Sequence, residues 1–260
     1  MSLTIQSRIQ QSQQTKRTQW LLILAATITI VLMSGYQFYT KGVPYFAEKI
    51  SESLPEQVYE VVDESSLNEL DDLEFMASEL SDAEQGKIRA LFNLLLSKDT
   101  HGNRDYKLEF RQWGGKANAM ALANGTIIIT DSMVVLTDTD QELSAILLHE
   151  IGHVEHNHVM ESLVSSSIVF VTLTAVLGDI SALSDIIVQG AMLGLNQGYS
   201  QQAELEADFY AHERMTKKYG DGTSMISIFE KLAIQLKGQH SWLSSHPSFE
   251  KRIEKIKRTD

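Results

Sequence analysis

Four of the eight histidines in this chain lie within ten residues, in the stretch HEIGHVEHNH at positions 149 to 158. His149 and His153 are four positions apart, so an α-helix places both imidazoles on one face, one turn apart. Two such imidazoles can bind one tetrahedral metal ion, and Glu150 can reach a water on that ion without binding it. Because zinc lowers the pKa of bound water towards about 7, the pattern indicates metal-assisted peptide hydrolysis with Glu150 as general base.

The alternative interpretation of this stretch is a solvated polar helix face. The rest of the helix argues against it, because its other face is apolar and its start carries a capping box, from Thr139 to Glu142. Such a helix can turn its histidines towards a cleft. His156 and His158 do not complete the ligand spacing, and we interpret them as solvated or as hydrogen-bond partners of the ligands.

A catalytic zinc requires a third protein ligand and one open position. The chain has no cysteine, so the candidates are Asp, Glu and the remaining His. In the stretch QAELEADFYAHERM, Glu204 and Asp208 are four apart and share a helix face. Glu204 could complete the site, and Asp208 could accept the second N–H of a ligating histidine. Spacing alone leaves Glu206 as an alternative ligand and an exposed acidic face as the alternative to both.

The pair HEIGH and, some fifty residues later, ELEAD resembles the membrane-linked gluzincin metallopeptidases. These include the HtpX heat-shock proteases, the CAAX prenyl proteases and the periplasmic proteases that tend outer-membrane assembly. Their downstream motif E-x-x-A-D is matched here by Glu204, Ala207 and Asp208. The resemblance implies a zincin-like domain with one zinc per chain, held by His149, His153 and Glu204.

Two further stretches resemble the same family. NAMALANGTIIIT resembles the hairpin before the zinc helix, and SHPSFEKRI resembles the C-terminal S-H-P-x-x-x-x-R-I segment. We expect an extended substrate to add as a β-strand along the first strand of the hairpin. Such pairing uses main-chain hydrogen bonds and therefore depends little on the substrate's sequence. That strand comprises Asn118, Ala119, Met120, Ala121 and Leu122. His246 or Arg252 is expected to donate to the oxyanion, the alternative being a capping or surface role.

The composition limits the classes of protein. The chain has 260 residues, of which 43% are apolar, so it can build a sizeable core. Its net charge of −12 argues against a nucleic-acid partner. The absence of cysteine excludes disulfides and thiolate metal sites but leaves the redox compartment open.

The N-terminus contains an uncharged stretch at positions 20 to 39, which is about the length needed to span a bilayer. Trp20 and Tyr39 are placed as interfacial aromatics, and Lys16 and Arg17 precede the stretch. We therefore predict a cytoplasmic tail at 1–19 and a signal anchor at 20–39, with the remainder exported. The alternative is a cleaved signal peptide.

The remaining chain predicts an α+β fold, mostly helical, with a small sheet beside the zinc helix. Residues 41–100 form a helical acidic region, and 101–260 the metallopeptidase domain. A capping box at Ser81 begins a helix, residues 106–113 alternate like a strand, and Asn124-Gly125 indicates a hairpin turn. Further helices are expected at about 201–218 and 222–237 and from about 248.

Residues 163–195 are unusually apolar and small, interrupted by Asp179 and Asp185. Each uninterrupted run is at or below the length that spans a bilayer. We interpret the segment as a buried or surface-lying helical hairpin, with membrane insertion as the alternative. It connects the zinc helix to the helix carrying Glu204, so it either covers the cleft or packs as core.

Together these patterns predict a zinc-dependent endopeptidase, anchored by one span in the inner membrane and facing the periplasm or exterior. Its polypeptide substrates would be misfolded or unassembled envelope proteins, a step that follows from the resemblance. The alternatives are a zinc-binding or chaperone-like envelope module without proteolysis, and a membrane-embedded protease with several spans. Glu150 weighs against the first, because a structural zinc site needs no general base.

Overall fold

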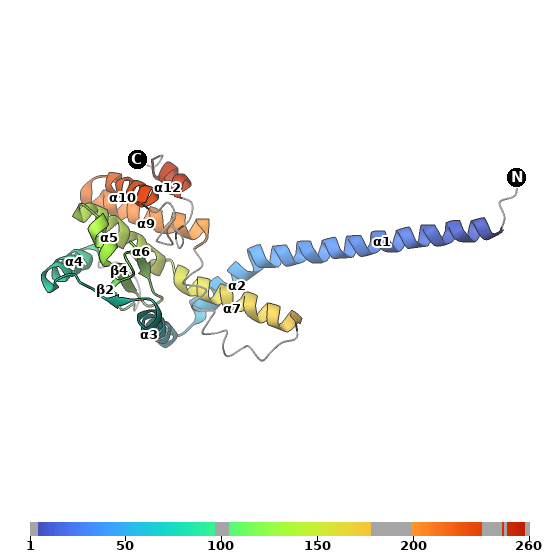
Figure 1. The fold of residues 1–260 in the computed structure, drawn as a ribbon, viewed down its shortest axis with the longest axis horizontal. Helices are drawn as coiled ribbons and strands as arrows, with labels where there is room; N and C mark the ends of the chain where they lie inside the picture. The colour runs from blue at the N-terminus through green and yellow to red at the C-terminus, as the bar shows by residue number, and fades with distance from the viewer. Residues whose placement is uncertain (1–4, 97–103, 178–198, 236–245, 247–248, 258–260) are drawn as a thin grey trace. The chain divides into compact units, whose positions relative to one another are not determined.

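The computed structural model describes residues 5–96, 104–177, 199–235, 246 and 249–257, and divides into two units, Met1–Phe46 and Ala47–Asp260. The first unit holds helix α1 (Ile5–Gln37), a π-helical turn η1 (Phe38–Gly42) and the start of α2 (Val43–Ser53) (Figure 1). Among the described residues one continuous helical stretch, Gln13–Ser53, is long and apolar enough to cross a membrane. It contains the predicted anchor.

The second unit is mostly helical, with one small sheet, which confirms the predicted fold class. Its further elements are α3 (Glu56–Leu73), β1 (Met76–Ala77), α4 (Asp82–Leu95), β2 (Lys107–Gln112), β3 (Ala119–Ala121), β4 (Thr126–Thr130), α5 (Asp131–Leu136), α6 (Asp140–Glu155), α7 (His158–Leu177), α9 (Gln201–Tyr219), α10 (Thr223–Gln235) and α12 (Phe249–Lys257). Of the segment 163–195, the first part continues α7. Residues 178–198 lie outside the described residues.

The sheet has the order β1-β2-β4-β3, so β3 lies at an edge. β4 is antiparallel to β3 and parallel to β2, and β1 is antiparallel to β2. The predicted hairpin joins β3 to β4. In its turn the Leu122 N–H donates to the Thr126 carbonyl at 2.7 Å, and Gly125 has φ +107°, a conformation that glycine adopts without strain.

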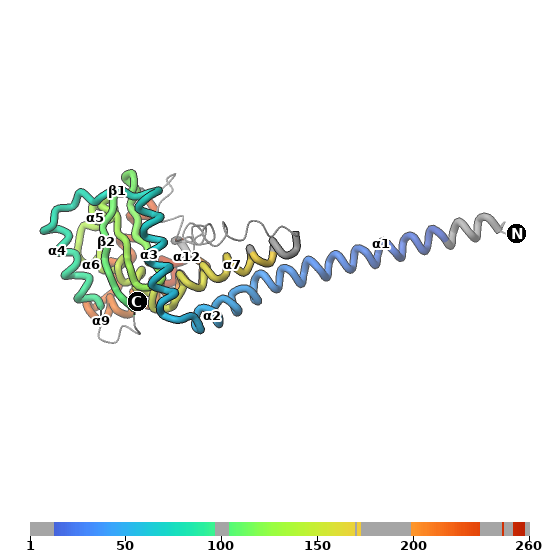
Figure 2. Tube along the Cα trace, turned by 90° about the horizontal axis from the view of Figure 1, so that it is seen from below, coloured from blue at the N-terminus to red at the C-terminus, as the bar shows by residue number. Residues whose placement is uncertain are grey.

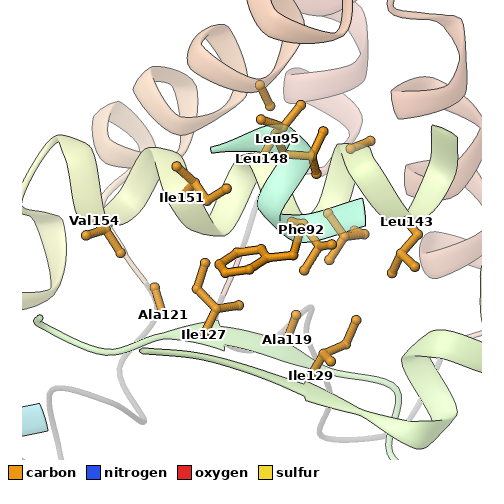
Figure 3. Close-up of a cluster of buried hydrophobic side chains, with 14 of the residues drawn as sticks. Phe92, Leu95, Ala119, Ala121, Ile127, Ile129, Leu143, Leu148, Ile151 and Val154 are labelled. Carbon is orange, nitrogen blue, oxygen red and sulfur yellow. The ribbon is translucent and has the colours of Figure 1, made fainter. Parts of the chain in front are cut away.

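Helices cover both faces of the sheet. Figure 3 shows the side packed by α6 and α4, where Phe92 and Ile151 meet Ala121 and Ile127. On the opposite face Leu70 of α3 packs with other apolar side chains from the sheet and its flanks. Figures 1 and 2 show α6 between the sheet and α9. In Figure 1, α10 and α12 also lie on the side of α6 that faces away from the sheet. α6 is therefore the central helix, and all of its residues from Glu142 to Val154 are buried.

The helix starts follow local side-chain chemistry. Ser81 and Glu84 form both halves of the predicted capping box. At α6 the Thr139 side chain accepts the Glu142 N–H at 3.1 Å, as predicted, but the Glu142 carboxylate accepts from the Asp138 N–H instead of from Thr139. Glu142 also accepts from Lys231 of α10 at 2.6 Å. The start of α6 is therefore fixed by its own cap and by an ion pair to a neighbouring helix.

Candidate metal centre

Close packing of α6 against α9 assembles the centre. Gly152 of α6 lies so close to α9 that a Cβ atom there would be 3.0 Å from the Ala207 Cα and 3.1 Å from its carbonyl oxygen. Only glycine permits this approach without displacing the helix. The contact places Glu204, one turn before Ala207, opposite His149 and His153.

The side chains of His149, His153 and Glu204 converge, and each is 0% exposed. The two Nε2 atoms are 3.1 Å apart. Glu204 Oε2 is 3.7 Å from His149 Nε2, and Glu204 Oε1 is 3.6 Å from His153 Nε2. Donors at about 2.0–2.1 Å from a tetrahedral zinc lie roughly 3.3 Å from one another. The spacing and the N₂O donor set therefore fit one zinc ion.

His246, which precedes α12, belongs to the same cluster. Its Nδ1 lies 3.2 Å from His149 Nε2 and 3.0 Å from Glu204 Oε1, and it is 1% exposed. One donor atom from each of the four residues lies within 4.8 Å of the others. His246 thus lies beside the position of the metal, close enough to bind the ion or to contact a group on it.

Asp208 and Arg252 lie behind the cluster. Asp208 Oδ1 is 3.0 Å from His149 Nδ1, the ring nitrogen that faces away from the metal position. Burial alone would raise the pKa of Asp208, but the Arg252 guanidinium and the His149 ring lower it to about 2. Arg252 also lies 2.5 Å from Glu204 Oε2. The pair therefore holds one histidine and the glutamate in place.

Glu150 is fully buried beside the donors but is not one of them. Its Oε1 lies 3.6 Å from His246 Nε2. A carboxylate at this place can accept a proton from a metal-bound water without occupying a coordination position. The cluster therefore contains the groups needed for metal-assisted hydrolysis.

The model of one protein family, Peptidase family M48, matches residues 82–260, which include every residue of this cluster. The chain belongs to this metallopeptidase family. The family uses zinc, as predicted, and the four-residue cluster can hold a metal ion. The match begins at α4, inside the region 41–100 that was predicted to precede the metallopeptidase domain.

Individual metallopeptidases are also similar to this chain. This chain is 32% identical over 147 residues to metalloprotease LoiP of Escherichia coli (strain K12). The match covers 54% of this chain and 57% of LoiP. Metalloprotease YcaL of the same organism is 27% identical over 148 residues, with the same two coverages. The Beta-barrel assembly-enhancing protease of Yersinia pestis is 30% identical over 129 residues, which are 45% of this chain and 26% of that protein. The matches thus span about half of LoiP and YcaL and less of the third protein.

The predicted substrate strand lies beside the zinc helix of this metallopeptidase. The strand Asn118–Leu122 is buried except for Met120, which is partly exposed. Thr130 N–H donates to Asn118 O, and Leu122 N–H to Thr126 O. In an antiparallel pair the hydrogen-bonded residues alternate, so the backbone N–H and C=O groups of Ala119 and Ala121 point away from β4. They form an edge that no described strand pairs with.

Two further side chains contact His153: Tyr199, which the sequence did not indicate, and His158, which it predicted to be solvated or a hydrogen-bond partner of the ligands. The Tyr199 ring stacks on the His153 ring with centroids 3.9 Å apart and planes 20° apart. His158 lies 3.1 Å from His153 between their Nδ1 atoms. Tyr199 directly precedes Ser200, the N-cap of α9, so the sequence could have placed Tyr199 at the start of that helix. No spacing rule pointed to its contact with His153.

Proposed function

We propose that this chain is a zinc-dependent endopeptidase of the cell envelope that hydrolyses misfolded or unassembled envelope proteins. The observation that carries the proposal is the buried set of His149, His153 and Glu204 with Glu150 beside it. A structural zinc site has no use for the extra carboxylate, so Glu150 favours catalysis over a non-proteolytic zinc module.

Zinc held by His149, His153 and Glu204 would polarise a water and lower its pKa. Glu150 would accept a proton from this water as a general base and pass it to the leaving amine as a general acid. Asp208 orients the His149 ring. His246, or Arg252 if its pairing loosens, donates to the oxyanion. Arg252 is already engaged by Asp208 and Glu204, which favours His246 for this role.

The substrate would lie as an added strand along Ala119 and Ala121, since their backbone donors and acceptors point away from β4 and no described strand pairs with them. Pairing through the main chain places the scissile carbonyl with little dependence on sequence. This suits a protease of unfolded chains. The name of the relative from Yersinia pestis, a β-barrel assembly-enhancing protease, supports an envelope substrate for this chain as well.

The proposed location is the inner membrane, with one span and the second unit in the periplasm or exterior. The apolar stretch Gln13–Ser53 supports this orientation, because Lys16 and Arg17 near its start precede the uncharged residues 20–39. A membrane-embedded protease with several spans would need a second apolar helix. Among the described residues no second helix is long and apolar enough to cross a membrane.

The deciding experiment compares the full chain in detergent with Glu150→Gln, which keeps the shape and removes the proton acceptor. We expect both proteins to carry about one zinc, and casein cleavage by the variant to fall at least about a hundredfold. Equal cleavage by both proteins, or the loss of zinc together with activity, would contradict the role of Glu150. No cleavage by a zinc-loaded wild type would favour the non-proteolytic module.

A further inference from the structure

The chain reverses direction directly after the zinc helix. α6 ends at Glu155, and Asn157 adopts φ +61°, the one positive φ of a non-glycine residue among the described residues. Asparagine is among the few residues that adopt this left-handed conformation at low cost. The Arg104 guanidinium donates to Asn157 Oδ1 at 3.2 Å and secures the turn. The consequence is that α7 starts with His158 directed back towards α6.

His158 contacts the rear of a ligand in the proposed zinc site. Its Nδ1 lies 3.1 Å from His153 Nδ1, and the residue is 5% exposed. Its other nitrogen, Nε2, lies 3.0 Å from Glu206 Oε2 on α9. Glu206 in turn accepts from the Gln202 side chain at 3.0 Å, and 42% of its side chain is exposed. A continuous chain of contacts therefore runs from His153 to the surface.

If His153 binds zinc, the direction of both hydrogen bonds from His153 through His158 to Glu206 is determined. If His153 Nε2 supplies a lone pair to zinc, its Nδ1 carries the hydrogen and donates to His158 Nδ1. The His158 Nδ1 atom must then be an acceptor, so its hydrogen is on Nε2 and points at Glu206. Each nitrogen in this series of contacts is then either a donor or an acceptor, and the series ends at the Glu206 carboxylate, which accepts. Histidine ligands generally require such a partner for their second nitrogen.

We propose that His158 is a positioning residue for the metal centre, which fixes the tautomer and ring orientation of His153 and is itself fixed by Glu206. The proposal rests on the proposed zinc function. It gives the two histidine ligands different supports: His149 faces the carboxylate of Asp208 directly, whereas His153 faces a neutral imidazole with a carboxylate beyond it. The α6–α7 turn and α9 thereby both contribute to the orientation of one ligand.

The test measures the metal and not only activity. His158→Phe keeps a ring and removes the acceptor, whereas His158→Asn places an amide oxygen near the position of Nδ1. We expect His158→Phe to weaken zinc binding by about 10- to 100-fold, as is typical when a ligand's partner is removed. It should also release zinc faster to a chromogenic chelator and shift the visible absorption bands of the Co²⁺-substituted protein. His158→Asn should restore most of the zinc affinity.

His156→Phe is the matched control, because His156 is exposed and two residues away in the same turn. It should bind zinc like the wild type. A second pair, Glu206→Leu against Glu206→Gln, tests the end of the chain, and Leu should weaken zinc binding more because Gln keeps an acceptor. This pair also decides the matter if His158→Phe does not fold.

Zinc binding that is unchanged in His158→Phe, or equally weak in His158→Phe and His158→Asn, would overturn the positioning role. So would equal zinc affinity in Glu206→Leu and Glu206→Gln. These results differ from a failure of the proposed function, in which His149→Ala would leave zinc binding unaffected. That failure would overturn both proposals, whereas a failure confined to the His158 and Glu206 variants overturns this one alone.

Discussion

Arg252 donates two hydrogen bonds of 2.7 Å to the two carboxylate oxygens of Asp208, and both side chains are almost fully buried behind His149. Arg252→Met would remove both of these hydrogen bonds. The buried Asp208 carboxylate would lose its cationic partner and keep its contact with His149. Removing one partner of a buried ion pair costs about 3–5 kcal/mol of the free energy of unfolding. We expect a loss of this size in thermal unfolding, together with reduced zinc content.

Arg252→Lys should retain part of the stability, because one ammonium group cannot make both parallel bonds. Lys257→Met is the surface control, since Lys257 forms an exposed pair with Glu230. Its effect should stay within about 0.5 kcal/mol. An Arg252→Met protein as stable as the wild type would show that the pair contributes little.

The ligand set is tested by His149→Ala and Glu204→Ala in the full chain. Each removes one of three protein donors, so zinc content measured after dialysis should fall sharply in both. Glu206→Ala retains the three donors and should keep more zinc than Glu204→Ala. Wild-type stoichiometry in both ligand variants would exclude these residues as ligands.

Features that depend on neighbouring residues were predictable from the sequence, and features that depend on distant ones were not. The Asn124-Gly125 turn and the Ser81 cap are local, and both hold in the structure. The parallel pairing of β2 with β4 and the two-residue β1 were not predicted, because strand pairing between separate segments leaves no local pattern. In the same way the Asn157 turn, which places His158, has no periodic signal.

The choice among the acidic residues of α9 shows the same limit. Spacing could not separate Glu204 from Glu206, and the family resemblance was needed to choose. In the structure Glu204 is buried against α6, whereas Glu206 reaches His158 from the edge of the helix. The difference arises from how α9 is rotated on α6, which the Gly152 contact determines.

The substrate edge is tested by Ala121→Pro. The Ala121 N–H points away from β4, so proline should remove a donor from the outer edge of β3 without breaking the hairpin. We expect casein cleavage to fall while zinc content and the unfolding midpoint stay near wild type. Leu122→Pro is the contrasting variant, because it removes the N–H that donates to Thr126 and should lower the unfolding midpoint. Unimpaired cleavage by a folded Ala121→Pro protein would mean that substrate binds elsewhere.

Topology is tested with reporter fusions at Lys41 and Asp260. One span with the N-terminus in the cytoplasm predicts that both fusions report the exported side. Alkaline phosphatase activity and green fluorescence distinguish the two sides of the membrane. If the fusions disagree, a further span lies between them, and the single-span orientation is wrong.

The pH dependence of stability is tested at Glu161. Burial, followed by the charges of Glu48, Glu206 and Glu52, raises its pKa to about 7. Because the folded-state pKa lies above the unfolded value, the stabilising contribution is complete below pH 4.5 and is lost as the pH rises through 7. Glu161→Gln should therefore raise the unfolding midpoint relative to wild type at pH 8 more than at pH 5.

The exposed Glu60→Gln is the control for this measurement, and its midpoint should follow that of the wild type at both values of pH. A Glu161→Gln protein whose difference from wild type is the same at pH 5 and pH 8 would contradict the raised pKa.

The contact between Gly152 and Ala207 has a consequence for which ions the centre accepts. The histidines belong to one helix and the glutamate to the other, so the opening between them is set by the distance between two helix backbones. A bulkier residue at 152 would push α9 away from α6 and widen that opening, although none of the ligand residues would be changed. The spacing of the donors, and with it the size of ion that they fit, therefore depends on two residues outside the donor cluster.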